Sequence, residues 1–570
     1  MSAVGEINTV INRRRLLSGI AGLSTAAVAV ASDAGPKKSA AKASALHERE
    51  TIADTVYGKV RGTETKDGIR TFLGVPYGDD TSGPNRFMPP KKPKHWQGIR
   101  DATRWGSRSP QMSGSGGEIG LFFYFGADDI GPVGEDCLVL NIWAPRATAG
   151  HHKRPVMVRI HGGGFTSGCG SYPMYRGRNM ALESDVVYVS LNHRLACAGF
   201  LDLSWVGDER YAHSGNAGML DLVAALEWLR DNIENFGGDP SSVTLFGESG
   251  GGFKISTLLG MPSAQGLFHK AIIESGPGLS VRTPIESREL TVRYLRRMGL
   301  DKSKYLDLMK VSLPFMLEVQ ALAASNRFFP LDPPVPHTLA GSYGPVLDGD
   351  VIPKNMFDPV ATPLSASVPV MVGYNKNEGT FFQFQDPQLF ALDEVGLNAR
   401  VKTLAPKDPE RVLKVYKTAY PNLSPTKLLV QISTDAVMGA NSVVLAERKA
   451  QLAAAPVYMY RFDWQSPAFD GNLGATHGLE IPFFTNNVDV MPVMTHGSPE
   501  ATRLARQASS ACVAFAKTGM PSLPDGPTWP PYSEQNRATM LLDSRCSVAT
   551  DPITSAVRAL WHEVLPGGAL

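Results

Sequence analysis

Short apolar runs rich in β-branched residues recur along the chain, and longer stretches with helical periodicity separate them. Six of these runs predict strands of a central sheet: residues 156–160, 186–191, 243–246, 271–274, 368–372 and 457–460. Apolar residues recur at helical spacing over residues 217–235, 501–518 and 555–564. Strands that alternate with helices form a largely parallel sheet covered on both faces. We therefore expect an α/β fold whose ligands bind beyond the carboxyl ends of the strands.

Two stretches have sequence patterns that do not favour strands of such a sheet. Residues 313–345 are rich in proline, and residues 406–453 have a helical pattern. We expect both to form a cap over the functional site. The candidate site residues are spread from residue 162 to residue 477 and must meet in one place, which predicts a single large domain over residues 51–570 with insertions.

The N-terminal fifty residues differ in composition from the rest of the chain. Asn12-Arg13-Arg14-Arg15 opens an apolar run rich in Ala and Gly, which ends in the small-residue cleavage pattern Ala29-Val30-Ala31. This pattern indicates a twin-arginine export signal over residues 1–31, and its apolar run is too short and too weak to span a membrane. Residues 32–50 are expected to form a flexible leader. The sequence therefore predicts a periplasmic or secreted protein.

Composition narrows the function classes. Lys and Arg total 56 against 54 Asp and Glu, a formal charge of +2 that predicts no nucleic-acid partner, and 43% hydrophobic residues suffice for a large core. The five cysteines are an odd number and lie far apart, which argues for mostly buried thiols rather than a disulfide framework. His151-His152 indicates a solvated loop, and no cluster has metal-ligand spacing. We expect no metal, no other cofactor, and a monomer or homodimer.

The strongest chemical signal is a serine between glycines. The apolar run at residues 243–246 leads into Gly247-Glu248-Ser249-Gly250-Gly251. A G-x-S-x-G pattern between a strand and a helix is typical of a nucleophile elbow, which lifts the serine hydroxyl above the sheet. Ser249 is therefore the candidate nucleophile, and the helix that follows presents unpaired N–H groups beside it.

A second glycine-rich turn supplies further hydrogen-bond donors. The predicted strand at residues 156–160 ends in His161-Gly162-Gly163-Gly164, a loop that can present backbone N–H groups to the oxyanion of a tetrahedral intermediate. We assign the donors to Gly163, Gly164 and Gly250. His161 is interpreted as a support for this loop rather than a proton carrier.

A candidate acid and a candidate base follow later in the chain. Glu378 lies in a loop just past the strand at residues 368–372, and His477 lies in a glycine-flanked loop that can reach a neighbouring strand end. Glu480 and Asp348 remain open as alternatives for the acid. The order serine, acid, histidine is that of α/β-hydrolases and differs from the orders in the two major serine protease folds.

With these residues in view, the chain resembles the type-B carboxylesterase family, which includes cholinesterases and bacterial esterases that act on nitrobenzyl esters. The likeness spans residues 52–564. Ordered motifs carry it, among them Glu135-Asp136-Cys137-Leu138, Asn192-His193-Arg194-Leu195, Gly215-Asn216-Ala217-Gly218 and Asn235-Phe236-Gly237-Gly238-Asp239-Pro240. The resemblance implies an α/β-hydrolase fold with Ser249, Glu378 and His477 as its triad. It also implies an active-site gorge whose entrance is lined by Phe122, Phe123, Tyr124 and Phe125.

The sequence departs from the family pattern at three positions. Gly250 replaces the usual alanine, which predicts a roomier elbow and a wider pocket. Ser109 stands where the family has the cysteine that pairs with Cys137. Lys254 lies in the first turns of the helix after the elbow, where a small residue is more common and the helix dipole disfavours a cation. We expect its amine to reach solvent or to pair with a carboxylate.

These features predict an exported serine carboxylesterase that acts on a small-molecule ester. His477 takes the Ser249 proton as the serine attacks the ester carbonyl, the three glycine N–H groups hold the oxyanion, and Glu378 orients the imidazole. The resulting acyl-enzyme is then hydrolysed. Amides, carbamates, lactones and thioesters remain alternative substrates for the same mechanism. A non-catalytic binding module is the other class to consider.

Overall fold

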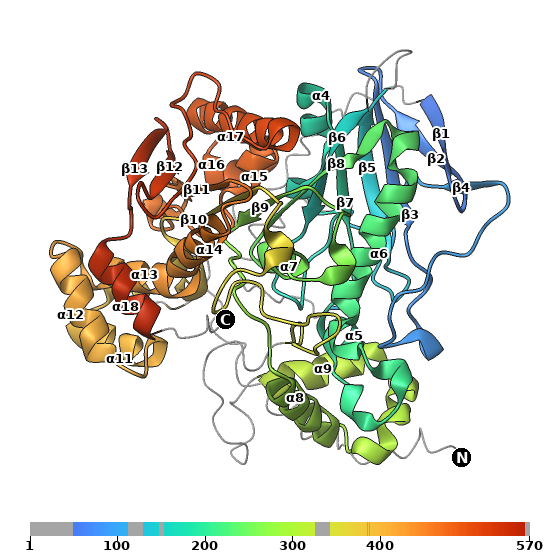
Figure 1. The fold of residues 1–570 in the computed structure, drawn as a ribbon, viewed down its shortest axis with the longest axis horizontal. Coiled ribbons are helices and arrows are strands. Elements are labelled where there is room, and N and C mark those ends of the chain that lie inside the picture. Colours follow the sequence, from blue (N-terminus) through green and yellow to red (C-terminus); the bar gives the residue numbers. More distant parts are fainter. Residues whose placement is uncertain are drawn as a thin grey trace, which may run out of the picture.

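One sheet of 13 strands runs through the molecule (Figure 1). A computed structural model describes residues 49–111, 129–146, 153–324, 343–384, 386 and 388–564. The strands are β1 (Arg49–Thr55), β2 (Gly58–Glu64), β3 (Ile69–Pro76), β4 (Ile99–Asp101), β5 (Val139–Pro145), β6 (Arg154–Ile160), β7 (Val187–Leu191), β8 (Gly238–Glu248), β9 (Lys270–Glu274), β10 (Val370–Asn375), β11 (Val457–Phe462), β12 (Ala538–Leu542) and β13 (Ser547–Thr550). All six predicted strands are confirmed, as β6 to β11.

The α-helices connect these strands and flank the sheet. They are α4 (Arg178–Ser184), α5 (Ala196–Phe200), α6 (Ala217–Asn232), α7 (Gly250–Leu258), α8 (Pro284–Arg297), α9 (Leu313–Ala324), α10 (Glu378–Gln383), α11 (Glu394–Leu404), α12 (Pro409–Ala419), α13 (Pro425–Thr434), α14 (Ala440–Gln451), α15 (Ile481–Phe484), α16 (Pro492–Thr495), α17 (Pro499–Thr518) and α18 (Ser555–Val564). The three predicted helices are confirmed as α6, α17 and α18. At the end of α6 the chain tightens into a 3₁₀ turn at Ile233–Phe236.

The sheet is parallel at its centre and antiparallel at its edges. Its strand order is β1-β2-β3-β5-β7-β6-β8-β9-β10-β11-β12-β13, and β4 pairs with β2. Neighbours from β7 to β12 run parallel, whereas β1, β2, β3, β5 and β13 add antiparallel edges. The parallel strands β6, β8, β10 and β11 therefore end at the same edge, and the loops after them carry the candidate site residues.

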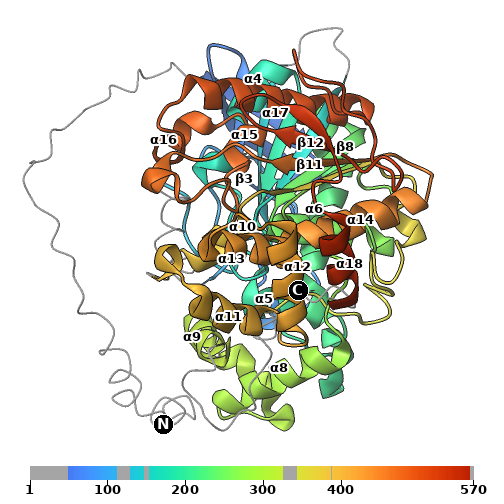
Figure 2. The same cartoon turned by 90° about the vertical axis from the view of Figure 1, so that its left-hand side faces the viewer.

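Helices cover both faces of the sheet. Because alternate side chains of each strand point to opposite sides, one strand contributes to two separate cores. On β6, Val156, Val158 and Ile160 enter the core beneath α6, α7 and α14, whereas Met157 enters a second core beneath α4, α15 and α17. Figure 2 shows α17 on one side of the strands and α6 and α14 on the other. This double cover explains why the central strands are continuous apolar runs rather than alternating ones.

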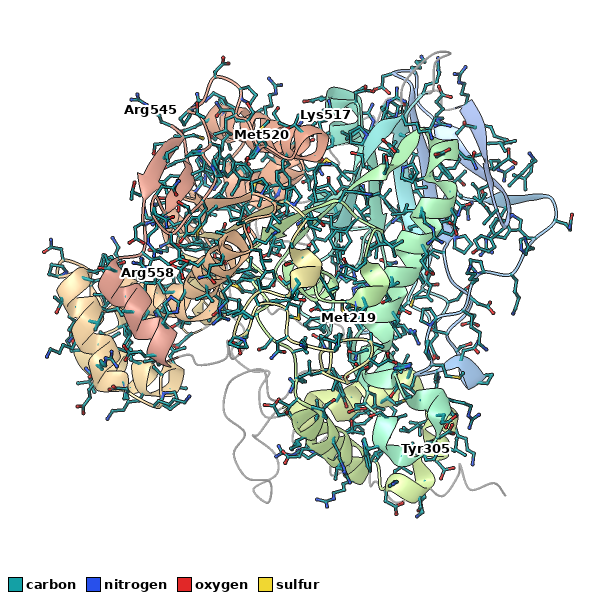
Figure 3. All side chains as sticks on the ribbon, viewed as in Figure 1. Met219, Tyr305, Lys517, Met520, Arg545 and Arg558 are labelled. Atoms are coloured by element: carbon teal, nitrogen blue, oxygen red, sulfur yellow. The ribbon has the colours of Figure 1, made fainter. Side chains whose placement is uncertain are left out.

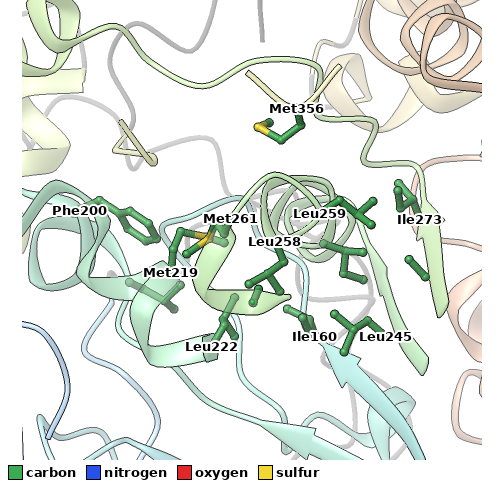
Figure 4. Packing of buried hydrophobic residues seen from close by; sticks show 14 of the residues in the cluster. Ile160, Phe200, Met219, Leu222, Leu245, Leu258, Leu259, Met261, Ile273 and Met356 are labelled. Atoms are coloured by element: carbon green, nitrogen blue, oxygen red, sulfur yellow. The ribbon is translucent and has the colours of Figure 1, made fainter. Parts of the chain in front are cut away.

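Helix α7, which follows Ser249, is anchored deep in the first core. Leu258 and Leu259 at its end share a cluster with Ile160 of β6 and Leu245 of β8 (Figure 4). Met219 of α6 joins the same cluster and lies inside the molecule (Figures 3 and 4). The nucleophile turn therefore sits on a rigid support.

The cap prediction is correct only in part. Residues 343–345 and the π-helical turn at Asp435–Gly439 border the active-site cavity. However, α14 packs against β10 and β11, so this part of the predicted cap is sheet cover. Among the described residues, one helix, Pro425–Gln451, is long and apolar enough to cross a membrane. Because 89% of its most apolar window is buried inside the protein, it is a core helix.

The five cysteines are all free thiols, and four of them are buried, as the sequence predicts. Ser109 lies close enough to the Cys137 thiol to influence its pKa, so it stands where a disulfide partner would have to be. At the N-terminal end, β1 begins at Arg49, two residues before the predicted start of the domain at residue 51. The predicted export signal and the rest of the leader lie outside the described residues, as does His151-His152.

Candidate active site

Ser249 stands at the turn between β8 and α7. Its backbone has φ 54° and ψ −122°, a conformation that costs a non-glycine residue about 1–3 kcal/mol. The turn is held by the Ser249 N–H, which donates to Glu274 O at 2.8 Å, and by Ser249 O, which accepts from Phe253 N at 3.0 Å. The serine side chain is half-buried and borders a cavity. These are the features of a strained nucleophile elbow.

His477 and Glu378 meet beside this turn. The His477 Nδ1 atom lies 2.5 Å from Glu378 Oε2, and the second carboxylate oxygen accepts from the Asn375 N–H at 2.6 Å. Glu378 is fully buried as the first residue of α10, immediately past β10, and His477 is 5% exposed. The contact engages Nδ1, so Nε2 is the nitrogen that remains for a second partner.

The loop that carries His477 is tied to the end of β10 by side-chain amides. Asn375 Nδ2 donates to Thr476 O at 2.7 Å, and Asn377 Oδ1 accepts from Ala475 N at 3.0 Å. The Asn377 N–H donates back to Ala475 O at 3.0 Å. These three bonds fix the backbone on the N-terminal side of His477, so the imidazole is placed by two asparagines that sequence reasoning missed.

The two alternative acids do not bond to the imidazole. The buried Glu480 accepts from Ser275 Oγ at 2.7 Å and from Asn375 Nδ2, and burial raises its pKa well above the usual range. Asp348 instead closes a turn, where it accepts from Asn216 Nδ2 and from Ile352 N, each at 2.9 Å. Of the three candidate carboxylates, Glu378 is therefore the one that contacts His477.

A further carboxylate, Glu248, faces the opposite edge of the imidazole. Its Oε1 atom lies 3.1 Å from His477 Nε2. Burial raises the pKa of Glu248. Burial alone would lower the pKa of His477, but Glu248 and Glu378 outweigh it and raise that pKa. Within the described part of the chain, no hydrogen bond joins Ser249 Oγ to His477. Glu248 precedes Ser249 in the elbow motif, and that adjacency was the signal that could have revealed it.

The glycine loop after β6 approaches the nucleophile turn closely. Gly163 and Gly164 have φ of 85° and 59°, and both line the cavity together with Ser249. A Cβ atom on Gly250 would lie 2.2 Å from Gly164 O and 2.5 Å from Gly164 N. The predicted wider pocket at Gly250 is therefore wrong, because the backbone of the glycine loop fills the space that an alanine methyl would occupy.

The expected roles of Lys254 are also wrong. Its side chain is fully buried, so it does not reach solvent, and among the described residues it forms no ion pair with a carboxylate. Its Nζ atom instead donates to His161 O at 3.2 Å. The helix after the elbow thus bonds directly to the first residue of the glycine loop.

The cavity beside Ser249 has a volume of about 320 Å³. Its wall is mainly apolar and includes Phe165, Phe253, Leu279, Phe382, Val437 and Met438. The aromatic residues expected at the gorge entrance, Phe122, Phe123, Tyr124 and Phe125, lie outside the described residues. Across the described ranges, no group of three or more His, Cys, Asp or Glu side chains could hold a metal ion.

Comparisons with known proteins agree with this geometry. Residues 49–560 match the carboxylesterase family. The para-nitrobenzyl esterase of Bacillus subtilis (strain 168) is 35% identical over 88% of this chain and 96% of its own length. The phenmedipham hydrolase of Pseudarthrobacter oxydans is 32% identical over 88% and 97%. The solved structure of the Geobacillus stearothermophilus carboxylesterase EST55 superposes with a TM-score of 0.77 at 34% identity, covering 90% of this chain and all of that one.

A match of this length, together with the parallel sheet and the elbow at its edge, goes beyond likeness in one motif. The resemblance stated from the sequence is confirmed over almost the same residues. The chain belongs to the carboxylesterase family, with the α/β-hydrolase fold, and it is a carboxylic ester hydrolase.

Proposed function

We propose that the protein is an exported serine carboxylesterase in which Ser249 is the nucleophile, His477 the general base and Glu378 the acid that orients it. The observation that carries this proposal is the 2.5 Å contact between His477 Nδ1 and Glu378 Oε2, made beside a serine held in a strained turn. A contact with Nδ1 commits Nε2 to proton transfer on the serine side. In free enzymes such proton-transfer bonds are often long and tighten only when substrate binds.

In the first half of the reaction, Ser249 Oγ forms a bond to the ester carbonyl carbon and its proton passes to His477 Nε2. The carbonyl oxygen becomes an oxyanion, which accepts from the N–H groups of Gly163, Gly164 and Gly250. Glu378 stabilises the imidazolium. When the tetrahedral intermediate collapses, the bond to the alkoxy oxygen breaks and His477 returns the proton to it, so that alcohol leaves.

In the second half, water replaces the alcohol. His477 takes a proton from the water as its oxygen bonds to the acyl carbon, and the same three N–H groups hold the second oxyanion. Collapse breaks the bond to Ser249 Oγ, which recovers its proton from His477. The carboxylic acid leaves and the enzyme returns to its starting state with all protons accounted for.

The apolar wall of the cavity favours an ester with an apolar or aromatic group. Phe165 and Leu279 offer no charge to such a group, and a cavity of about 320 Å³ is at the small end of the usual range for ligand pockets. The relative from Bacillus subtilis bears the name para-nitrobenzyl esterase. An aryl ester is therefore the first probe to choose.

The first experiment measures hydrolysis of p-nitrophenyl esters, from acetate to long acyl chains, by the mature protein and by Ser249→Ala. We expect burst kinetics in the wild type and a loss of at least about 10⁴-fold in kcat in the variant. A matched p-nitroanilide tests the amide alternative. Wild-type protein that neither turns over an ester nor reacts with a fluorophosphonate probe would contradict the triad and favour a binding module.

Export rests on the Arg13-Arg14-Arg15 pattern and the apolar run after it. The test expresses the full chain in a bacterium and follows esterase activity in the periplasmic and medium fractions. Replacing all three arginines with lysine should retain the enzyme in the cytoplasm, because the twin-arginine pathway requires the pair. Unchanged distribution of activity would contradict this route.

A further inference from the structure

The helix after the nucleophile carries a lysine that the proposed reaction does not use. Lys254 lies on α7, five residues after Ser249, and none of its surface is exposed. Its Nζ atom donates to His161 O at 3.2 Å and stands 5.5 Å from the centre of the Phe165 ring. Both contacts are to the loop that supplies Gly163 and Gly164. The lysine therefore spans the two segments that form the candidate oxyanion hole.

Burying an amine at this place is costly. The first turns of α7 disfavour a cation, and burial lowers the pKa of Lys254 to about 7, although the nearby Glu248 opposes this effect. A lysine stem is long enough to snorkel to water from many buried positions, yet this one points inward. The amine donates to His161 O whether or not it is charged, so the contact survives in both protonation states.

Two buried histidines, His161 and His193, lie near the lysine. The rings of His161 and His193 stack at 4.8 Å between centres, and each ring places Nδ1 2.9 Å from a backbone carbonyl, Gly162 O and Arg194 O respectively. Burial and the Lys254 amine lower the pKa of His161 to about 3, and that of His193 well below its usual value. Neither imidazole therefore competes with Lys254 as a cation.

The atoms that Lys254 joins have little freedom. A Cβ atom on Gly251, in the first turn of α7, would lie 2.2 Å from Ile160 O and 3.2 Å from His161 O. The loop therefore starts in direct contact with the helix. Because His161 O belongs to the planar peptide that leads into Gly162, a bond to it fixes the orientation of the peptide from which the chain continues to Gly163 and Gly164.

We propose that Lys254 is a positioning residue that clamps the glycine loop to the nucleophile helix and so aims the Gly163 and Gly164 N–H groups at the oxyanion. This inference rests on the proposed function, since it concerns the same site. A donor misplaced by a fraction of an ångström loses much of its effect on the transition state while it changes substrate binding little. The clamp should therefore act on kcat.

The test compares Lys254→Met, which keeps the stem and removes the donor, with Lys254→Gln, which keeps an N–H donor without charge. Lys449→Met is the matched control, because Lys449 is also fully buried and donates to a backbone carbonyl, Ala366 O, at 2.9 Å. It lies on α14 and plays no part in the proposed reaction. Fluorophosphonate titration counts folded active sites in every preparation.

We expect Lys254→Met to lower kcat on a p-nitrophenyl ester by about tenfold to a hundredfold, with KM within about twofold. Affinity for a trifluoromethyl ketone, whose adduct with serine is an oxyanion, should fall in the same proportion as kcat/KM. Lys254→Gln should recover part of both losses. Lys449→Met should leave both values unchanged even if its melting temperature falls.

Two results would overturn the clamp while leaving the triad intact. One is a kcat and a ketone affinity for Lys254→Met within about twofold of wild type. The other is a fall in kcat with unchanged ketone affinity, which would assign the loss to a step without an oxyanion. If Lys254→Met does not fold, Lys254→Leu, which also lacks the donor, carries the same comparison. Turnover that survives in Ser249→Ala would instead contradict the proposed function itself.

Discussion

Glu248 and His477 face each other at the reacting edge of the imidazole, with 3.1 Å between Glu248 Oε1 and His477 Nε2. The imidazole thus lies between two carboxylates, because Glu378 holds the other nitrogen. Both carboxylates favour the protonated ring and raise the pKa of His477. In the proposed mechanism His477 must be neutral before it can accept a proton, so we expect this arrangement to set the pH at which the enzyme becomes active.

The Glu248→Gln variant tests this effect. Removing the negative charge beside Nε2 destabilises the imidazolium, so the pKa of His477 falls and the base becomes available at lower pH. We expect the acidic limb of the kcat/KM profile to move down by about 1–2 pH units. The profile is measured with an aryl ester whose leaving group does not titrate in the range. An unmoved or raised acidic limb would contradict the coupling.

The carboxylates Glu378 and Glu480 should respond differently to the same change. Glu378→Gln replaces the carboxylate with a neutral amide, which no longer stabilises the imidazolium and can favour the wrong imidazole tautomer, and we expect kcat to fall by about 10⁴-fold. Burial raises the pKa of Glu480 and so favours its neutral form, which glutamine resembles. Glu480→Gln should therefore stay within about tenfold of wild type. Equal losses in the two variants would reopen the assignment of the acid.

The sequence predicted those parts of the molecule that local pattern and covalent neighbours decide. The strand before Ser249 is a buried apolar run, and the glycines around the serine are demanded by the turn itself, so both could be read directly. Glu378 was predicted because it lies just past a strand end, and His477 because it lies in a glycine-flanked loop that can reach a neighbouring strand end. Chain order and loop position sufficed for these assignments.

The same reasoning failed where the outcome depends on contacts between distant segments. The gain of space expected at Gly250 ignored Gly164, which is 86 positions away in the sequence but whose backbone packs against it. Lys254 was expected to seek water or a carboxylate, because no local pattern reveals that His161 O lies within reach. The sequence shows that Glu248 precedes Ser249 in the motif. Its contact with His477 Nε2 could not be predicted, because that contact depends on how the fold brings the two segments together.

The close approach at Gly250 predicts that Gly250→Ala is harmful, although alanine is the usual residue in the family. The added methyl group would collide with the Gly164 backbone, so the glycine loop must shift or the turn must strain. Overpacking of this kind costs about 1–3 kcal/mol of stability. We expect kcat to fall by about tenfold or more as a donor moves out of place. Wild-type kcat with an unchanged melting temperature would show that the loop yields freely.

A buried ion pair beneath the elbow predicts a large loss of stability. Arg159 Nη1 lies 2.6 and 2.8 Å from the two carboxylate oxygens of Glu274, and both side chains are fully buried. Arg159→Met leaves the buried Glu274 carboxylate without its partner, which should lower the free energy of unfolding by about 3–5 kcal/mol. Urea unfolding followed by fluorescence measures the change. Arg159→Met combined with Glu274→Gln should recover part of the loss, because no charge is then left unpaired. A double variant less stable than the single one would contradict this account.

Because its cysteines are free thiols, we expect a reductant to leave the stability of the folded protein unchanged. All five are free thiols, and Cys137, Cys169, Cys197 and Cys512 are buried, so stability owes nothing to a disulfide. Burial raises the pKa of Cys137 and Cys197 and so keeps both protonated and unreactive. Titration with a chromogenic disulfide should find five thiols in denaturant and at most one, Cys546, in the native protein. The melting temperature should be the same with and without dithiothreitol. A fall in that temperature on reduction, or fewer than five thiols in denaturant, would mean that a disulfide forms in the mature enzyme.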